Sequence, residues 1–544
     1  MLSRNHLAVN KWTAKVNFLL LVAWLSLSFF GIHGQLDSLG FISIDCGYTK
    51  SPNYTDSETG ITYVSDEGFT DYSGLIHTVN MSNMEPDLFP QWTRRYQALR
   101  FFPNGTRNCY TLRSLTPGGK YLVRAVFGYD NYDMRDGLVT FDLYLGVNYW
   151  TTVDILGRRG AAFTFEIIVE SPANYLQVCL INTGSGTPFI SGLDLRQFQA
   201  NFYPDSNATQ SLVLFGSFGL LAGLELSRYH FGTYYRDDIR YPDDRYDRIW
   251  QRYEDDPFLT TVPDIINGTV KNYPNDTYGA PSAVMRSVST PVNDSEGMSV
   301  GRLSYPSIEG MESLAVLYVL YFTEVEILQE DEFREFNILL DDLPLVSAFR
   351  PEQMLTTVVA GTMGPSGPTE NGVNIHSVYL EPTSNSKPPL ISAMEIYWIR
   401  PVDGSATDSG DASAMMTIKT KYSVDRFWAG DPCLPVAYAW DGLNCTYNTT
   451  SGGLSRIIAL YLSSSKLNGE IDPSFGKLTL LQHLDLSHNN LSGSIPNFFG
   501  QLPSLVFLDL SSNNLSGRIP TSLLQKSQNG WLTLRIDNNP NCFV

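Results

Sequence analysis

The sequence predicts a mostly β protein in which two similar β-sandwiches precede a short solenoid. From residue 41 to residue 198, short apolar runs with period-two alternation are separated by Gly, Pro, Asn and Asp, a pattern typical of half-buried strands in a sandwich. A second set of such runs, between residues 314 and 399, repeats the first in the same order. After Cys445 leucines recur at a fixed interval, which indicates stacked coils.

The N-terminal segment indicates secretion. Arg4, Lys11 and Lys15 precede the apolar run Val16–Phe30, and Gly34 offers a small residue before a cut at Gln35. The run is shorter than the ~20 residues that cross a bilayer as a helix. We therefore expect residues 1–34 to be a cleaved signal peptide, with a retained membrane anchor as the alternative. No later segment is apolar enough to cross a membrane, so we expect an extracytoplasmic product without an anchor.

Potential glycosylation sites are dense, as in the surface loops of a secreted glycoprotein. The N-x-S/T sequons begin at Asn53, Asn80, Asn104, Asn207, Asn267, Asn275, Asn293, Asn444, Asn448, Asn490 and Asn514. The formal net charge of -19 argues against a nucleic-acid partner or an anionic membrane surface, because both require clustered Lys and Arg.

The two sandwiches are expected at residues 38–200 and 201–400. Their closest match aligns Pro188–Leu195 with Pro389–Ile396, where apolar and acidic positions coincide. Convergence of two unrelated edge strands is the alternative to duplication. Between them, Tyr234–Pro257 is crowded with Asp, Arg and aromatic residues. Its interleaved arginines would neutralise the carboxylates more readily than a metal cation would, so we interpret it as an ion-paired packing segment.

The remaining chain divides into a linker, a cap and repeats. Residues 401–425 are predicted to be a linker, with a short helix over Ala414–Val424. Residues 426–453 contain Cys433 and Cys445 with two nearby tryptophans, which suits a cap over the apolar end of a repeat array; a chance loop is the alternative. In residues 454–544, Leu460, Leu484 and Leu508 follow a 24-residue interval, with a looser fourth repeat at Leu534.

Asn489 and Asn513 occupy the ladder position of the repeats, where an inward amide can satisfy backbone groups of the turns. Ser465 holds that position in the first repeat, which weakens that rung.

Several motifs carry a resemblance to a known family. Gly430-Asp431-Pro432-Cys433, followed by Trp440 to Cys445, resembles the junction in plant receptor-like kinases that have a malectin-like ectodomain ahead of leucine-rich repeats. The strings at Gly40–Gly47 and Leu99–Leu112 are similar to that family, as are Phe127–Asp133 and Asn182–Arg196. The Leu-Ser-Gly-x-Ile-Pro motifs resemble the plant extracellular class of repeats. The resemblance implies tandem malectin-like sandwiches, leucine-rich repeats, and a receptor ectodomain without its membrane helix and kinase.

The six cysteines are too few for a disulfide-dominated scaffold, although an oxidising compartment would permit pairs. We favour Cys433–Cys445 and Cys109–Cys179, and the partners of Cys46 and Cys542 stay open. Asn541-Cys542 resembles the start of a closing cap whose second cysteine is missing.

Two sets of candidate binding residues follow. Malectin itself is a carbohydrate-binding sandwich, and a sugar site needs aromatic faces and Asp or Asn side chains. Tyr129, Asn131, Tyr132 and Trp150 supply these types, with a core role as the alternative. In family members the repeats contact peptide ligands or co-receptors. His483 and Phe507, which lie between core leucines, are the outward candidates for partner binding.

The sequence lacks the constellations of an enzyme. It contains no His-Glu-x-x-His, no G-x-S-x-G elbow, no phosphate-binding lysine loop and no kinase motif. We therefore expect no catalysis, no cofactor and no metal site. The predicted function is extracellular recognition of a peptide or glycan ligand, with receptor-like kinase co-receptors as partners, at the cell wall or the outer face of the plasma membrane. A secreted cell-wall lectin and a decoy regulator of a full-length receptor are the alternatives.

Overall fold

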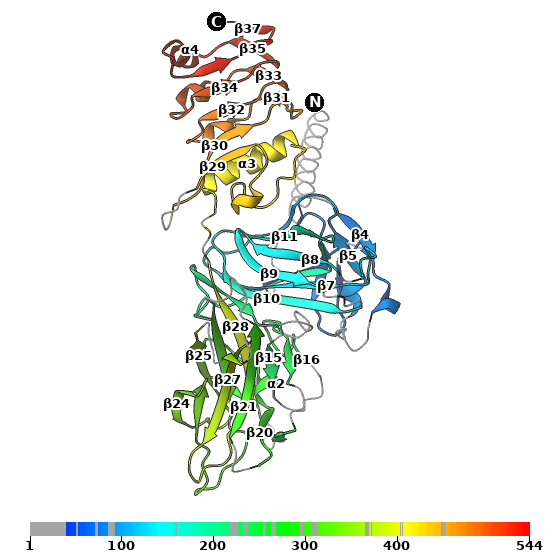
Figure 1. The fold of residues 1–544 in the computed structure, drawn as a ribbon, viewed down its shortest axis with the longest axis vertical. Helices are drawn as coiled ribbons and strands as arrows, with labels where there is room; N and C mark the ends of the chain where they lie inside the picture. Colours follow the sequence, from blue (N-terminus) through cyan, green and yellow to red (C-terminus); the bar gives the residue numbers. More distant parts are fainter. Residues whose placement is uncertain are drawn as a thin grey trace, which may run out of the picture.

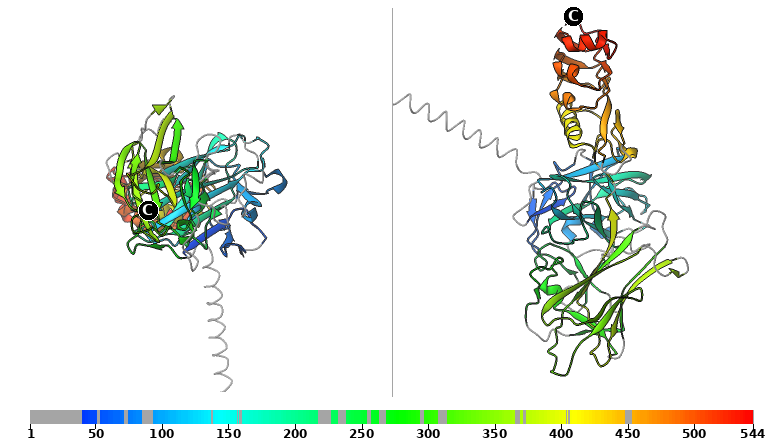
Figure 2. Two further views of the ribbon diagram at one scale, coloured as in Figure 1. Left: turned by 90° about the horizontal axis from the view of Figure 1, so that it is seen from below. Right: turned by 90° about the vertical axis from the view of Figure 1, so that its left-hand side faces the viewer.

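A column of coils stands on two β-sandwich lobes, and the three parts follow one another along the long axis of the molecule (Figures 1 and 2). The computed structural model describes residues 40–50, 53–70, 74–84, 93–136, 138–155, 157, 160–216, 227–231, 238–253, 257–262, 268–293, 297–306, 314–364, 369–370, 373–402, 404, 406–447 and 453–543. The predicted signal peptide lies outside these residues. Within them, no helix has the length and apolar character that a bilayer crossing requires.

The first lobe is built mainly from antiparallel strands whose inward side chains contribute to a large apolar core, as the period-two pattern predicts. Its elements are β1 (Phe41–Asp45), β2 (Asn53–Thr55), β3 (Thr62–Ser65), β4 (Leu75–Thr78), η1 (Met81–Asn83), η3 (Thr93–Tyr96), β5 (Ala98–Phe101), β6 (Arg107–Arg113), β7 (Lys120–Gly128), β8 (Thr140–Leu145), β9 (Asn148–Asp154), β10 (Ala162–Glu170), β11 (Tyr175–Ser185), β12 (Phe189–Ile190) and β13 (Gly192–Gln197).

The second lobe is again built mainly from antiparallel strands. Its elements are β14 (Gln210–Leu214), β15 (Arg228–His230), β16 (Asp238–Ile239), β17 (Trp250–Arg252), β18 (Leu259–Val262), β19 (Lys271–Asn272), α2 (Ser282–Met285), β20 (Val288–Pro291), β21 (Met298–Pro306), β22 (Ala315–Phe322), β23 (Phe336–Leu340), β24 (Leu343–Phe349), β25 (Leu355–Met363), β26 (Thr369–Glu370), β27 (Val373–Pro382) and β28 (Ala393–Pro401).

One sheet runs through both lobes. Strand β14 pairs with β10 of the first lobe on one side and with β28 of the second on the other, both antiparallel. Among the described residues this sheet has 14 strands. Because sheet hydrogen bonds cross the lobe boundary without a break, the lobes are joined through their backbones as well as through side chains.

A ladder of buried charges lies on one face of this shared sheet. Arg124 on β7 faces Glu166 on β10 and Asp194 on β13, and Arg228 on β15 faces Glu395 on β28. Arg124 Nε lies 2.6 Å from Glu166 Oε1, and Arg228 Nη1 lies 2.6 Å from Glu166 Oε2. All five side chains are fully buried. The alternation of sign between neighbouring strands lets each buried charge meet an opposite one.

The segment between the lobes closes this ladder, in agreement with its interpretation as an ion-paired packing segment. Asp247 pairs with Arg124 at 3.1 Å, Arg196 at 2.8 Å and Arg240 at 2.8 Å. Although burial raises its pKa, these three arginines lower the pKa of Asp247 below its ordinary value. The described residues contain no group of three His, Cys, Asp or Glu side chains suited to a metal ion.

The C-terminal part begins with a helix, which leads into a cap and then a solenoid. Its elements are α3 (Ser409–Tyr422), η5 (Val436–Tyr438), β29 (Leu443–Thr446), β30 (Arg456–Tyr461), β31 (Asn468–Glu470), η6 (Pro473–Lys477), β32 (His483–Asp485), β33 (Asn490–Ser494), η7 (Asn497–Gln501), β34 (Phe507–Asp509), β35 (Asn514–Arg518), α4 (Thr521–Gln528), β36 (Thr533–Arg535) and β37 (Asn541–Phe543).

The helix α3 starts earlier than Ala414, the residue at which the sequence predicts its start. Asp408 precedes it, and the Asp408 carboxylate accepts hydrogen bonds from the backbone N–H groups of Gly410 and Asp411. This side-chain cap satisfies two otherwise unpaired helix donors, so the helix extends through the Gly- and Ser-rich stretch. The predicted linker over 401–425 is therefore largely helical where the structure describes it.

The repeats form two parallel sheets around a leucine core. Strands β30, β32, β34 and β36 make the first sheet, behind the antiparallel cap strand β29, and β31, β33, β35 and β37 make the second. The amide of Asn489 accepts from the N–H groups of Ser465 and Leu467 and donates to Leu462, Leu486 and Ser487 carbonyls. Asn513 repeats this pattern one coil later. The predicted asparagine ladder is confirmed.

Candidate functional site

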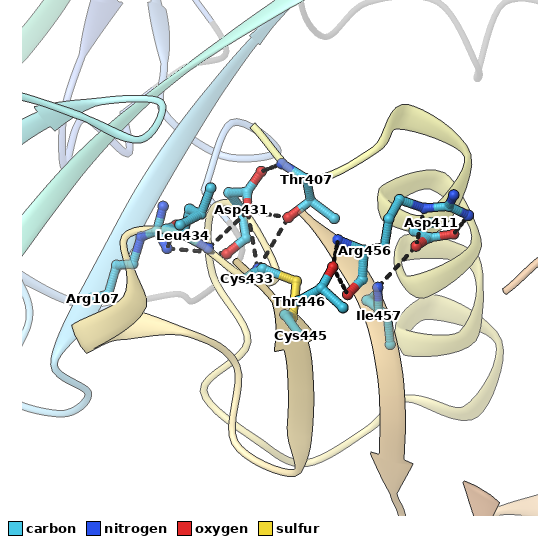
Figure 3. Close-up of a disulfide and its surroundings, with 10 residues drawn as sticks. All are labelled: Arg107, Thr407, Asp411, Asp431, Cys433, Leu434, Cys445, Thr446, Arg456 and Ile457. Atoms are coloured by element: carbon cyan, nitrogen blue, oxygen red, sulfur yellow. Dashed lines mark hydrogen bonds and ion pairs between the residues drawn. A yellow bond between two sulfur atoms is a disulfide. The ribbon is translucent and has the colours of Figure 1, made fainter. Parts of the chain in front are cut away.

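The cap is built around a turn that Asp431 organises. Its Oδ1 accepts hydrogen bonds from the N–H groups of Cys433 at 3.0 Å and Leu434 at 2.9 Å, and its Oδ2 accepts from Thr407 N–H at 2.9 Å (Figure 3). Cys433 is bonded to Cys445 on β29, with Cα atoms 6.0 Å apart. The turn is thus tied on one side to the chain before α3 and on the other to the first sheet of the solenoid.

Two tryptophans and a salt bridge complete the cap. Trp428 and Trp440 stack with ring centroids 4.9 Å apart and planes 14° apart, and both are buried over the first coil. On the far side of the cap, Arg456 Nε of β30 lies 2.9 Å from Asp411 Oδ2 of α3 (Figure 3). The open end of the leucine core is therefore closed by aromatic surface and by α3.

The cap docks on the first lobe through Arg107 of β6. Its Nη1 donates to the carbonyls of Asp431 at 3.1 Å and Leu434 at 2.9 Å (Figure 3). Burial lowers the pKa of Arg107 to about 10. Gly430, with φ +69°, lies flat against the guanidinium, where a Cβ atom would come within 2.2 Å of Nη2. The glycine is required at this position both by its backbone conformation and by this close approach.

The other predicted disulfide lies beneath the same contact. Cys109 of β6 and Cys179 of β11 are direct cross-strand neighbours and are bonded. They form a buried apolar cluster with Ile181 and with Ala429 of the cap. Both predicted disulfides are therefore present, and both lie at the joint between the first lobe and the solenoid. Cys46 and Cys542 are unbonded.

The first sheet of the solenoid carries the predicted partner-binding residues. His483 on β32 and Phe507 on β34 are register neighbours, half-buried, with ring centroids 6.0 Å apart. Two positions along, Asp485 neighbours Asp509. Next to Asp509, on β36, lies Arg535.

The predicted sugar-contact residues lie mainly inside the first lobe. Tyr129 and Trp150 are fully buried, so neither ring offers a face for stacking in this structure. Tyr132 packs against Phe189 and donates a hydrogen bond to the Thr187 carbonyl at 2.5 Å. Period-two alternation identifies aromatic strand residues but does not say which face is covered, and here the core face holds them. Asn131 and Tyr132 are the members of this set nearest the surface.

The predicted glycosylation sites lie mostly at exposed positions. Asn207 is half-buried, whereas Asn267 and Asn448 lie outside the described residues. The exposed asparagines are Asn53, Asn80, Asn104, Asn275, Asn293, Asn444, Asn490 and Asn514. Asn490 and Asn514 belong to β33 and β35 in the second sheet of the solenoid, away from the strands that carry His483 and Phe507.

The sequence patterns did not identify Arg107, which docks the cap on the first lobe, or the charged residues beside His483 and Phe507. Arg107 gave no signal, because its partners are backbone carbonyls more than 300 residues away in the chain. Asp485, Asp509 and Arg535 could have been found, since they hold one fixed position in successive repeats and that position alternates with core leucines.

Comparison with known proteins identifies two domain types. The family model for the malectin-like domain matches residues 44–399, and the model for the leucine rich repeat matches residues 455–515. A putative leucine-rich repeat receptor-like serine/threonine-protein kinase of Arabidopsis thaliana is 40% identical over 514 residues, which is 93% of this chain and 54% of that protein. The Arabidopsis LRR receptor-like serine/threonine-protein kinase IOS1 is 37% identical over 451 residues, or 81% of this chain and 46% of that one. The chain spans about half the length of these curated relatives.

Solved structures share the fold of the two lobes. The ectodomain of ANX2 from Arabidopsis thaliana superposes with a TM-score of 0.53 at 14% identity, covering 66% of this chain and 97% of that one. The plant receptor-like kinase FER superposes with a TM-score of 0.53 at 18% identity, covering 67% and 97%. A further structure contains the plant peptide RALF23 in complex with FER and LLG2, and it superposes with a TM-score of 0.51 at 17% identity, covering 67% and 96%.

Proposed function

This chain belongs to the malectin-like domain family, as a member with leucine-rich repeats, and from that premise we propose that it recognises a ligand or partner outside the cell in cell-surface signalling. The partners are a secreted peptide and a receptor-like kinase co-receptor. The proposal places the protein in the cell wall or at the outer face of the plasma membrane, where its disulfides would be stable.

The strand face of the first solenoid sheet carries this proposal. Tyr461 is 38% exposed, and His483 and Phe507 are half-buried and do not belong to the apolar clusters of the lobes among the described residues. Aromatic side chains on a rigid sheet, interspersed with charged ones, are typical of protein interfaces, because they bury much area at little entropic cost. The joint at Arg107 holds this sheet fixed on the first lobe.

The comparisons support the partner classes. The similar Arabidopsis proteins are receptor-like kinases by name. A solved structure that shares the fold of the lobes contains FER with the peptide RALF23 and with LLG2. A peptide ligand and a receptor-like kinase co-receptor are therefore the first partners to seek for this chain.

Photo-crosslinking in plant tissue tests the proposal. The tagged chain would carry a benzophenone amino acid at His483 or, as a matched control, at the exposed Ser494 of the second sheet. We expect a secreted peptide or a receptor-like kinase to be crosslinked from position 483 and not from position 494. We also expect the Phe507→Asp substitution to abolish that crosslink. Equal crosslinking from both positions, or none of these partners from position 483, would contradict the proposal.

Sugar recognition by the first lobe is a second proposal, now centred on Asn131 and Tyr132. Its support is the half-exposed loop in which these residues lie next to the exposed Met134. A glycan array probed with the whole chain tests it, with Asn131→Ala as the variant. Tyr129→Ala is unsuitable, because emptying a fully buried aromatic position destabilises a core by roughly 3–5 kcal/mol. Specific binding that Asn131→Ala leaves unchanged would refute this second proposal.

A further inference from the structure

The last coil of the solenoid holds an arginine against the coil before it. The guanidinium carbon of Arg535 lies 5.3 Å from the centre of the Phe507 ring, and its Nη1 lies 3.6 Å from Asp509 Oδ2. The guanidinium thus meets an aromatic face and a carboxylate at the same time. Side chains of Arg bind such sites well, because the planar group can stack and donate hydrogen bonds together.

One coil earlier the same acceptor groups recur, and the part of the chain that the structure describes places no cation against them. His483 takes the place of Phe507, and Asp485 takes the place of Asp509. The Oδ1 atom of Asp485 accepts from Ser487 N–H at 2.9 Å and from Ser487 Oγ at 2.6 Å. Among the residues that the structure describes, Asp485 Oδ2 has no hydrogen-bond or ion-pair partner.

The neighbours of Asp485 favour a positive charge at this place. Tyr461 of β30 and Asp509 of β34 flank it in register on the two adjacent strands. Adjacent strands are about 4.8 Å apart, so one guanidinium can reach both carboxylates. Arg535, whose side chain is 59% exposed, neighbours Asp509 in register, and among the described residues its ion pair is with Asp509 and not with Asp485.

We propose that Tyr461, His483, Asp485 and Phe507 form a seat for an arginine side chain of a protein partner, an inference that rests on the proposed function. The guanidinium would stack beside the His483 and Phe507 rings and pair with the Asp485 carboxylate, in the way that Arg535 lies over Phe507 and pairs with Asp509. The net charge of -19 attracts a cationic partner over a longer range. The sequons Asn490 and Asn514 lie on the second sheet, so glycans there would leave the seat accessible.

A small-molecule titration tests the seat without requiring the natural partner. The probe is N-acetyl-arginine amide, and its matched control is N-acetyl-citrulline amide, which has nearly the same shape but no charge. Ring signals of His483 in the histidine-labelled chain, assigned with His483→Gln, report binding by NMR. We expect saturable shifts with the arginine probe and at least roughly fivefold weaker binding of the citrulline probe, since most of the attraction is electrostatic.

Three variants sharpen the result. Asp485→Asn should weaken the arginine probe at least roughly fivefold, because the amide keeps the Ser487 contacts but loses the charge. Asp537→Asn, an exposed carboxylate beyond the seat, should change nothing. Arg535→Ala should tighten binding of the arginine probe, because it removes a neighbouring positive charge and frees the Asp509 carboxylate. Equal binding of both probes, or binding unaffected by Asp485→Asn, overturns the seat.

The crosslinking experiment separates this inference from the proposed function. If no peptide or receptor partner is crosslinked from position 483, the proposed function fails whatever the probe does. If the chain with the benzophenone at position 483 crosslinks its partner equally with Asp485 and with Asp485→Asn, recognition is intact and the arginine seat is overturned. A crosslink lost in Asp485→Asn and kept in Asp537→Asn supports both.

Discussion

Single residues at the joint between the first lobe and the cap have structural roles that their residue type alone does not reveal. Arg107 is a buried cation whose donors meet backbone carbonyls, and Gly430 is the residue that lets the cap lie against it. Hydrogen bonds from a charged donor to buried carbonyls contribute about 1.5–3 kcal/mol each, because an unmet buried carbonyl is costly. The Gly-Asp-Pro-Cys motif is therefore explained by its contacts: glycine for the close approach, aspartate for the turn, and cysteine for the tie to β29.

Gly430→Ala should destabilise the protein more than a glycine-to-alanine substitution at a position with a similar backbone conformation. Gly118, with φ +74° and no atom within 4 Å of an added Cβ, is the matched control. Both substitutions cost about 1–2 kcal/mol of left-handed strain, whereas only Gly430→Ala also displaces the Arg107 guanidinium. We expect the urea midpoint of Gly430→Ala to lie clearly below that of Gly118→Ala. Equal midpoints would show that the close approach is unimportant.

Asp45 should make the first lobe less stable as the pH rises. Burial, opposed by the Tyr54 hydrogen bond and by Arg95, raises its pKa to about 7. The folded state therefore keeps the proton between pH 4 and 7 while the unfolded state loses it. The free energy of unfolding should fall by about 1.4 kcal/mol per pH unit over this window.

The variant Asp45→Asn mimics the protonated carboxyl and isolates this contribution. Its stability advantage over wild type should grow from pH 4 to pH 7 and then stay constant. Urea unfolding at several pH values measures the difference. An advantage that does not change with pH would show that Asp45 is ionised in the folded protein throughout this range.

At the scale of elements, the sequence patterns predict most strands, because strands depend on local spacing and residue type. Of the two favoured disulfides, Cys433–Cys445 joins residues 12 positions apart, whereas Cys109–Cys179 spans 70 positions. Leu484 and Leu508 recur with the repeat, and the coils follow from that period alone. Strand pairing between distant segments is different. Nothing local in Gln210–Leu214 indicates that β14 joins β10 to β28 and fuses the lobes into one sheet.

The candidate site was only partly predictable for the same reason. His483 and Phe507 were identified because they alternate with core leucines. Tyr129 and Trp150 are candidates for a different reason, as aromatic residues on or beside a predicted loop, and both are fully buried in the first lobe. Asp485, the charged residue that would make the solenoid face selective, could be recognised only once the register had shown which side chains are neighbours.

The Cys433–Cys445 disulfide should stabilise the cap and the first coil selectively. Replacing both cysteines with serine removes a cross-link of 12 residues' separation, which costs about 3 kcal/mol. Hydrogen exchange followed by mass spectrometry should show faster exchange in β29 and β30, with β7 in the first lobe unchanged. Equal loss of protection in β7 would mean that the disulfide supports the whole chain, and the cap assignment would be wrong.

At the scale of the whole molecule, a packed joint, and not a flexible linker, connects the solenoid to the first lobe. The joint consists of the capped helix α3, the Cys433–Cys445 disulfide of the cap and the contact of buried Arg107 with cap carbonyls (Figure 3). A recognition surface held in this way loses less freedom on binding, which favours affinity. The fused sheet and its charge ladder extend the same rigidity to the second lobe.

A distance measurement between lobe and solenoid tests this central claim most directly. Spin labels at the exposed Arg113 of β6 and Gln525 of α4, in a chain with Cys542→Ser, report the separation by double electron–electron resonance. A single narrow distance distribution in the otherwise native chain, broadened by Arg107→Ala, is the predicted result. A broad distribution in the native chain, or one that Arg107→Ala leaves unchanged, would contradict the account.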